Sequence, residues 1–136
     1  MGVVVFDSDV LIGFLNRHDA HHQAAVTAVR AALKQQRRLL CAVNYSEILI
    51  GPLRAARQAE VEAMLGQFLF EIIQVDGALA RRAAAVRART QLKLPDAYAL
   101  ATAIHAEHRG YTDVRLESFD QKVLTAHAQL HPHTPS

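Results

Sequence analysis

Four carboxylate side chains stand where the chain leaves a predicted strand or enters the helix after it: Asp7, Glu47, Asp96 and Asp120. Because the carboxyl ends of parallel strands meet at one edge of a sheet, we expect these side chains to converge there. Carboxylates brought close together repel one another and tend to hold protons, and a divalent cation relieves that repulsion. Hard oxygen ligands suit Mg²⁺ or Mn²⁺, and such an ion can activate a water molecule for attack on a phosphodiester.

Each acid also has a purely structural interpretation. Glu47 completes an Asn44-x-x-Glu47 pattern that resembles a capping box. Asp96 lies in a predicted first helical turn, where the helix dipole favours negative charge, and Asp120 has the place of an N-cap. A fifth acid, Asp9, suits either a water-mediated metal contact or the cap of the next helix, and we favour the cap. Only the shared position of the four acids at strand exits favours a common site.

The elements that must position these acids alternate along the chain. Short apolar runs predict strands at 3–6, 39–43, 70–75 and 114–116. Helical patterns, with an expected interruption at Gly51-Pro52, cover 10–15, 20–35, 44–51, 53–68, 78–91, 94–109 and 120–128. Strands that alternate with helices predict an α/β fold, in which a largely parallel sheet carries helices on both faces.

Length and composition limit the class of protein. The chain has 136 residues, enough for one domain with its own core, and 51% hydrophobic and 21% charged residues, as in ordinary globular proteins. The single cysteine, Cys41, excludes an intrachain disulfide, and we expect it to be buried. No apolar run approaches the ~18 residues of a membrane span. We therefore expect a cytoplasmic protein that is not bound to a membrane.

Four segments, taken in chain order, resemble the motifs of PIN domains, and in particular of bacterial toxin ribonucleases of the VapC kind. They are VVFDSDVLI at 4–12, CAVNYSEILIG at 41–51, LKLPDAYALATA at 92–103 and LESFD at 116–120. The third segment is the most specific match, and the ordered set spans nearly the whole chain. The fourth departs from the usual pattern, because Glu117 is charged where a strand is normally apolar and Asp113 adds another acid nearby. Whether Asp113 or Glu117 contributes to the site stays open.

The resemblance implies a three-layer PIN-like sandwich, with a mostly parallel central sheet of four to five strands flanked by helices. Residues 1–130 would form a single nuclease domain and residues 131–136 a flexible tail. It also implies an endoribonuclease toxin dependent on Mg²⁺ or Mn²⁺, which leaves 5′-phosphate and 3′-hydroxyl ends. The metal-binding and catalytic residues would be Asp7, Glu47, Asp96 and Asp120, with Ser8 and Ser118 as polar neighbours and Asp9 as a further candidate. A homodimer and a cognate antitoxin complete the expectation.

Basic side chains must offset the repulsion between an acidic site and an RNA backbone. Lys93 is the best placed by sequence, and Arg17 is a further candidate. Two basic stretches, at 30–38 and 81–93, could also meet phosphates, although solvated helix faces explain such runs more often. Aromatic residues make up only 6% of the chain, so we expect recognition of RNA shape and of a single-stranded loop more than extensive base stacking.

Other functions compete with this interpretation. A PIN fold that binds RNA or a partner without cutting is the non-enzymatic alternative. Asp7-Ser8-Asp9 after an apolar strand also resembles the opening of haloacid-dehalogenase-like phosphatases, although Leu11 stands where that family has Thr or Ser. His18, His21 and His22 have helical spacing, which would suit a metal site or metal-free acid–base cleavage. We expect these histidines to be ordinary surface residues.

Overall fold

A computed structural model describes residues 2–130 of the chain, in which four strands alternate with seven helices. In chain order these are β1 (Val3–Phe6), α1 (Ser8–Leu15), α2 (His22–Leu33), β2 (Arg37–Cys41), α3 (Ala42–Arg54), α4 (Gln58–Gln67), β3 (Phe70–Ile73), α5 (Gly77–Arg89), α6 (Leu94–His108), β4 (Val114–Glu117) and α7 (Gln121–Leu130). The tail predicted over 131–136 lies outside the described residues. No helix between residues 2 and 130 is both long and apolar enough to cross a membrane.

All strands of the sheet are parallel, in the order β3-β2-β1-β4. In β1, Val5 pairs with Leu39 of β2 on one side and with Leu116 of β4 on the other. All four residues of β1 are buried, which explains why this strand reads as a continuous run of large apolar residues. The predicted largely parallel sheet is confirmed.

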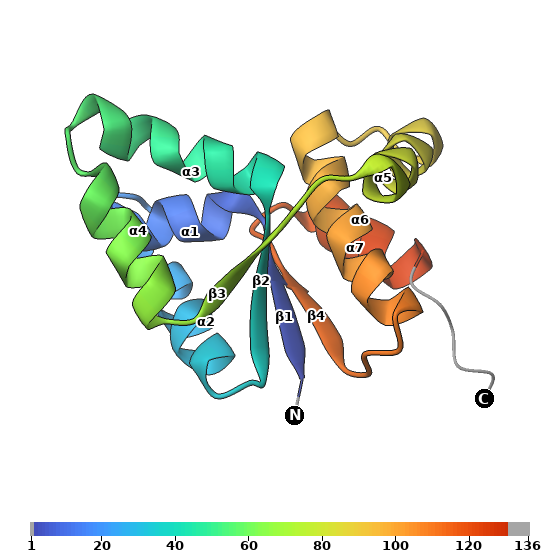
Figure 1. Cartoon of the computed structure of the whole chain (residues 1–136), viewed down its shortest axis with the longest axis horizontal. Helices are drawn as coiled ribbons and strands as arrows, with labels where there is room; N and C mark the ends of the chain where they lie inside the picture. The colour runs from blue at the N-terminus through green and yellow to red at the C-terminus, as the bar shows by residue number, and fades with distance from the viewer. Residues whose placement is uncertain (1, 131–136) are drawn as a thin grey trace.

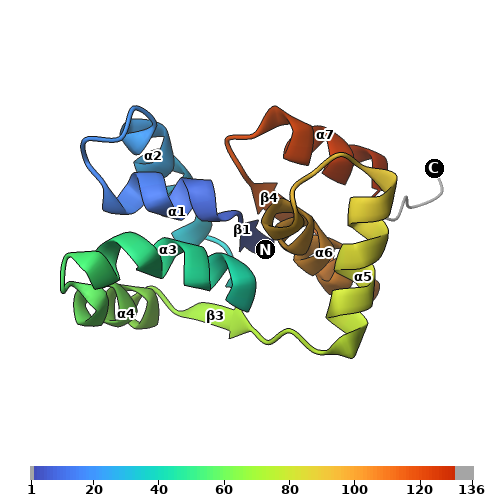
Figure 2. The same ribbon diagram turned by 90° about the horizontal axis from the view of Figure 1, so that it is seen from above.

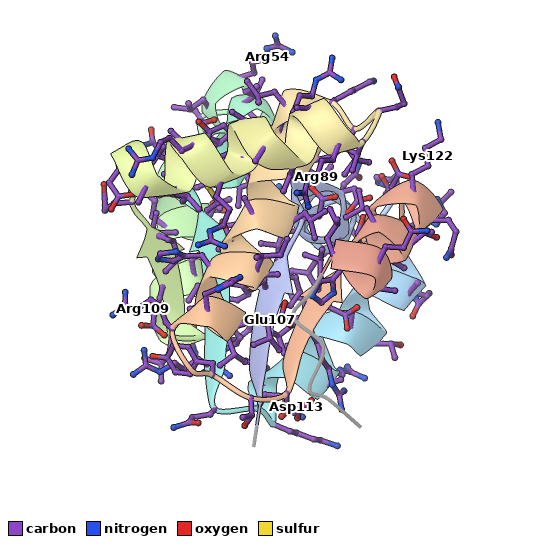
Figure 3. The ribbon with its side chains drawn as sticks, turned by 90° about the vertical axis from the view of Figure 1, so that its right-hand side faces the viewer. Arg54, Arg89, Glu107, Arg109, Asp113 and Lys122 are labelled. Carbon is purple, nitrogen blue, oxygen red and sulfur yellow. The ribbon has the colours of Figure 1, made fainter. Side chains whose placement is uncertain are left out.

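Helices cover both faces of the sheet, as Figures 1 and 2 show, with α1–α4 on one side and α5–α7 on the other. The alternation of side chains along β1 divides the core accordingly. Val3 and Val5 pack with residues of α5, α6 and α7, whereas Val4 and Phe6 pack with residues of α1–α4. On the second face, Glu107 of α6 lies beside α7 (Figure 3), and its Oε1 is 2.9 Å from Nε2 of His127. The predicted three-layer sandwich is confirmed.

The expected interruption at Gly51-Pro52 is wrong, because α3 continues through Pro52 to Arg54. The chain turns instead at Ala56, whose φ of 57° is left-handed, and α4 begins at Gln58. Pro52 stands in the last turn of α3. Its missing amide hydrogen therefore costs the helix a hydrogen bond near its end and does not interrupt the middle of the helix. Its own carbonyl accepts a hydrogen bond of 2.7 Å from the amide of Arg57, which closes the turn between the helices.

Two start signals were assigned to the wrong residues. Asp7, not Asp9, is the N-cap of α1, and the helix begins at Ser8. Asn44 is not a cap either, because β2 ends at Cys41 and α3 begins at Ala42, two residues before it. Both helices therefore begin directly after a strand, which places their first turns at the carboxyl edge of the sheet.

The buried Arg38 explains why β2 begins earlier than the apolar pattern predicted. This strand starts at Arg37 and ends at Cys41, where the sequence predicted 39–43. The guanidinium of Arg38 donates hydrogen bonds to the carbonyls of Ala32, Gln35 and Phe68, so a charged side chain is fully accommodated beside the core. Hydrophobicity alone could not indicate such a residue in a buried strand.

Candidate active site

Asp7 occupies the point where the sheet order reverses, between the carboxyl ends of β1 and β4. It follows β1 directly and is only 1% exposed. Its Oδ1 accepts a hydrogen bond of 2.8 Å from the amide of Ser8, and its Oδ2 accepts one of 2.9 Å from the hydroxyl of Ser118. Its own amide donates to the carbonyl of Glu117, so both strands hold it in place.

The environment of Asp7 favours a protonated or metal-neutralised carboxyl. Burial raises the pKa of Asp7 to about 7, and the negative charges of Asp9 and Asp96 add to the rise. The hydrogen bonds from Ser118 and from the amide of Ser8 oppose it, because they stabilise the ionised form. A carboxyl so far above its ordinary pKa, at a strand end, is typical of a functional site.

Asp9 and Asp120 lie beside Asp7 and are held by the loop after β4. The Oδ2 of Asp9 accepts a hydrogen bond of 3.0 Å from the amide of Phe119, whereas its buried Oδ1 has no hydrogen-bond partner among the described residues. Burial raises the pKa of Asp9, and the charge of Asp120 raises it further. The amide of Asp120 donates to the Ser118 hydroxyl, and its Oδ1 accepts from the amide of Lys122 in the first turn of α7.

Glu47 and Asp96 reach the site from α3 and α6. Asn44 connects the two helices, because its Nδ2 donates to Oε1 of Glu47 at 3.3 Å and to the carbonyl of Pro95 at 3.1 Å. Burial raises the pKa of Asp96, and the charges of Asp120, Glu47 and Asp9 raise it in that order. The predicted acids are thus electrostatic neighbours at one edge of the sheet.

Asp9 belongs with the four acids more closely than the sequence suggested. Its charge acts on both Asp7 and Asp96, and its unpartnered Oδ1 is buried beside them. The sequence feature that could have shown this is the position of Asp9, in the first turn of a helix that begins directly after β1. Of the two serines, Ser118 contacts Asp7 through its hydroxyl, whereas Ser8 does so through its backbone amide.

The donor set of this site suits a hard divalent cation. Carboxylates predominate, and two buried acceptors, Oδ1 of Asp9 and Oδ1 of Asn44, have no hydrogen-bond donor in the described part of the chain. Within residues 2–130, no group of three or more acidic, histidine or cysteine side chains is arranged so that it could hold a metal ion by itself. Mg²⁺ commonly keeps several waters and takes only one or two carboxylates directly, so an open cluster of this kind is compatible with it.

The basic residues expected to meet RNA lie at different distances from the acids. The positive charge of Lys93 opposes part of the rise in the pKa of Asp96, which places this exposed lysine near the acids. Arg17 lines a separate hollow with His18 and Arg57. Of the first basic stretch, Arg38 is buried and Arg37 pairs with Glu71 at 3.2 Å, which leaves Arg30 and Lys34 as its exposed cations.

Asp113 and Glu117, whose contribution to the site the sequence did not decide, lie at opposite ends of β4. Asp113 precedes β4, and its carbonyl accepts a hydrogen bond from the amide of Val3, so it lies at the amino edge of the sheet, away from the site. Glu117 ends β4 and is half-buried; burial raises the pKa of its carboxyl and Arg115 opposes that rise. Glu117 contributes to the site through its backbone carbonyl, which accepts from the amide of Asp7.

The histidines of the 18–22 segment do not form a metal group with one another. His18 and His21 are exposed, and Nδ1 of His22 lies 2.9 Å from the carbonyl of Gly13. The ring of His21 stacks on that of Phe119, with centroids 4.9 Å apart. Cys41 is fully buried, as predicted, and is therefore an apolar core residue.

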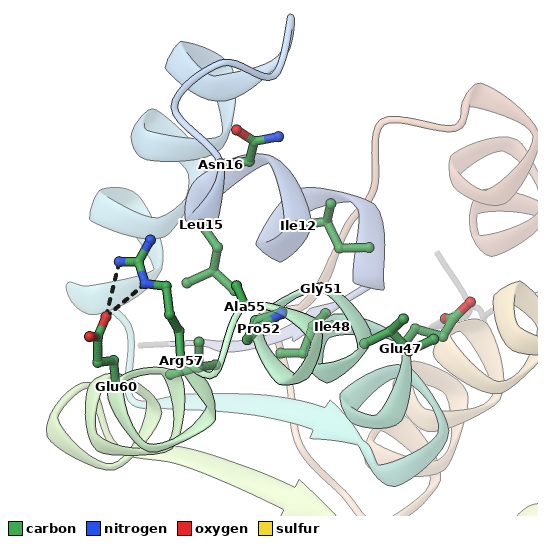
Figure 4. A pocket seen from close by; sticks show the side chains of 12 residues that line it. Ile12, Leu15, Asn16, Glu47, Ile48, Gly51, Pro52, Ala55, Arg57 and Glu60 are labelled. Atoms are coloured by element: carbon green, nitrogen blue, oxygen red, sulfur yellow. Dashed lines mark hydrogen bonds and ion pairs between the residues drawn. The ribbon is translucent and has the colours of Figure 1, made fainter.

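An apolar groove of about 740 Å³ adjoins the acids between α1, α3 and α4. Figure 4 shows Ile12 and Leu15 of α1 on one wall, and Glu47 at the end opposite Arg57 and Glu60. Ile12 and Ile50, which both line it, are 40% and 49% exposed. Large aliphatic side chains this exposed, next to one another, are typical of an interaction surface.

Comparisons with known proteins agree with this geometry. Residues 4–123 match the model of the PIN domain. A toxin–antitoxin complex from Klebsiella pneumoniae is similar in structure, with a TM-score of 0.69 and 26% sequence identity over 91% of this chain and 90% of that one. Among curated proteins, none shows significant similarity.

Two further solved structures share the fold at lower identity. VapC20 of Mycobacterium tuberculosis, a toxin that cleaves the sarcin–ricin loop, has a TM-score of 0.69 and 17% identity over 92% of this chain and 95% of its own. VapBC2 of Rickettsia felis, bound to a fragment of its promoter DNA, has a TM-score of 0.62 and 13% identity over 87% of this chain and 99% of its own. The match over residues 4–123 establishes the family: the chain belongs to the PIN domain proteins.

Proposed function

We propose that the protein is an endoribonuclease dependent on Mg²⁺ or Mn²⁺, and the toxin of a toxin–antitoxin pair. The observation that carries this proposal is the convergence of five carboxylates at the reversal point of a parallel sheet. They are Asp7, Asp9, Glu47, Asp96 and Asp120. Membership of the PIN family and the likeness to a toxin–antitoxin complex support it.

A bound divalent ion would lower the pKa of a water molecule and polarise the phosphodiester, so that cleavage leaves 5′-phosphate and 3′-hydroxyl ends. Asp7, Glu47, Asp96 and Asp120 would hold the ion, and Asp9 offers its free Oδ1. Ser118 orients Asp7 and stabilises its ionised form. Lys93 offsets part of the repulsion between the acids and an approaching phosphate.

The test is cleavage of a mixed cellular RNA pool by the purified protein, freed of any bound antitoxin, with Mg²⁺ or Mn²⁺. Parallel samples contain EDTA or the Asp96→Asn variant, and product ends are mapped. We expect 5′-phosphate ends that disappear in both samples, whereas Asp113→Asn, at the other edge of the sheet, cleaves as the wild type does. Cleavage that survives EDTA and Asp96→Asn would refute the acid–metal mechanism.

We further propose that the cognate antitoxin lies in the apolar groove between α1, α3 and α4. The groove offers exposed aliphatic side chains for an apolar face and ends at Glu47, so an occupant reaches the acids directly. A helical or extended segment with apolar anchors and a basic residue at that end fits this surface. A homodimer is part of the same proposal, and sedimentation of the free protein tests it.

The alternatives considered from the sequence have less support. A phosphatase of the haloacid-dehalogenase kind would have Thr or Ser where Leu11 stands, but Leu11 is a fully buried apolar core residue. The match to the PIN domain over 4–123 also speaks against that family. For a binding module without activity, the expected sign would be loss of an acid, but all four predicted acids are present and their charges act on one another.

A further inference from the structure

The stacked rings of His21 and Phe119 form a feature that the proposed chemistry does not use. The ring centroids lie 4.9 Å apart, with 27° between the planes. His21 stands just before α2, and Phe119 lies between β4 and α7, so two distant segments meet here. Asp19 fixes the turn that carries His21, because its Oδ1 accepts a hydrogen bond of 2.8 Å from the His21 amide.

One ring of this pair is supported and the other is open. Phe119 is half-buried and packs against the core between the sheet and α1–α4. His21 is exposed, so only one face of its ring is covered by Phe119. An aromatic ring that is packed on one face and exposed on the other can stack with a second flat ring.

The ring pair adjoins the acid site directly. A hollow of about 360 Å³ is lined by Asp9, Ile12, Asp19, His21, Phe119 and Asp120. The amide of Phe119 donates to Oδ2 of Asp9, and Phe119 is the chain neighbour of Asp120. Small-ligand sites begin at roughly 300 Å³, so this hollow is large enough for a single flat ring. A base bound in this hollow would place the atoms attached to it next to the carboxylates of Asp9 and Asp120.

We propose that His21, supported by Phe119, is a stacking platform for one nucleobase of single-stranded RNA next to the phosphodiester held at the acids. This proposal rests on the proposed ribonuclease function and adds a subsite to it. Every nucleobase has a flat face, and such stacking tolerates different sequences while requiring an unpaired base. A single platform agrees with the low aromatic content of the chain.

The test uses single-stranded RNA dodecamers that carry 2-aminopurine at one position each, because stacking quenches the fluorescence of this base. Binding is measured with Ca²⁺ in place of Mg²⁺. We expect quenching at one position with the wild type, and its loss with His21→Ala together with about tenfold weaker binding, the lower part of the range for one stacked base. His21→Phe keeps both, because it keeps the flat ring. His18→Ala, an exposed histidine outside the hollow, behaves as the wild type.

Two results would overturn the platform: His21→Ala that binds and quenches as the wild type does, or His21→Phe that is as weak as His21→Ala. Absence of any quenching with the wild type would overturn it as well. Circular dichroism and thermal unfolding of each variant exclude a folding defect. Cleavage with Mg²⁺ is followed separately: quenching that depends on His21 without cleavage refutes only the nuclease, and cleavage without an effect of His21 refutes only the platform.

Discussion

The hydroxyl of Ser118 donates a hydrogen bond of 2.9 Å to Oδ2 of Asp7, although 111 residues separate them in sequence. The same hydroxyl oxygen accepts a hydrogen bond of 3.0 Å from the amide of Asp120. One side chain thus connects the acid after β1 to the acid before α7. The distance between these two acids depends on it, and so does the charge state of Asp7.

Ser118→Ala should impair RNA cleavage at neutral pH by about tenfold and move its pH dependence to higher pH. The hydrogen bond from Ser118 lowers the pKa of Asp7, so its loss raises that pKa further, and a larger fraction of Asp7 is protonated at pH 7. A protonated carboxyl cannot hold a cation, so activity needs a higher pH. A pH–rate profile from pH 6 to pH 9 measures the shift.

The matched control is Ser46→Ala, because the exposed Ser46 hydroxyl donates its hydrogen bond to the carbonyl of Val43 within α3 and not to an acid. Its profile should coincide with that of the wild type. If Ser118→Ala also leaves the profile in place, then the hydroxyl does not control the charge of Asp7.

Stability without metal should fall as pH rises from about 4 to about 7. The folded-state pKa of Asp7 is raised from 3.8 to about 7, so the folded protein binds more protons than the unfolded chain in this window. Asp7→Asn removes this contribution and should raise the free energy of unfolding at pH 8 by roughly 2–4 kcal/mol, with little effect at pH 4. Urea unfolding with EDTA at both pH values is the measurement.

Mg²⁺ should stabilise the wild type at pH 8 and stabilise Asp7→Asn less, because binding to the folded state alone raises stability. Asp113→Asn serves as the control, since Asp113 is exposed, lies at the other edge of the sheet and pairs with Arg115. In EDTA, an Asp7→Asn protein that is less stable than the wild type at pH 8 would contradict the raised pKa of Asp7.

Arg38→Met should lower the free energy of unfolding by about 3 kcal/mol. The variant keeps an unbranched apolar stem but leaves the carbonyls of Ala32, Gln35 and Phe68 without their charged donor. Arg37→Met, which removes an exposed ion pair with Glu71 and the contact of the guanidinium with the Tyr111 ring, should cost only about 1 kcal/mol. Equal losses for the two variants, measured by urea unfolding, would contradict the structural role of Arg38.

Ile50→Asp should weaken binding of the cognate antitoxin by at least about tenfold. Ile50 lines the groove and is half exposed, so a charge there opposes an apolar anchor without disturbing the core. Calorimetric titration with the antitoxin measures the change. Leu33→Asp is the control, because Leu33 is comparably exposed on α2 but lies outside the groove. Similar losses for both would place the antitoxin elsewhere.

The sequence predicted the position of an acid in the fold wherever that acid follows a strand, because the geometry of a parallel sheet then fixes it. This holds for Asp7 and Asp120, and the motif around Asp96 led to the same edge. Asp9 was underestimated because the start of α1 depends on Asp7, which caps it. The apolar groove was not predicted, since it exists only where the faces of three helices meet. The burial of Arg38 was not predicted either, because its hydrogen-bond partners are backbone carbonyls that no sequence pattern marks.

The position of β4 at the edge of the sheet beside β1 has a consequence for how the protein is made. Strands β1, β2 and β3 are neighbours in sequence order and can pair while the chain is still being synthesised. Ser118 and Asp120 follow β4, so they reach Asp7 only when this last strand has left the ribosome and joined β1. A nascent chain that lacks β4 therefore has an incomplete acid site, even when β1, β2 and β3 have already paired.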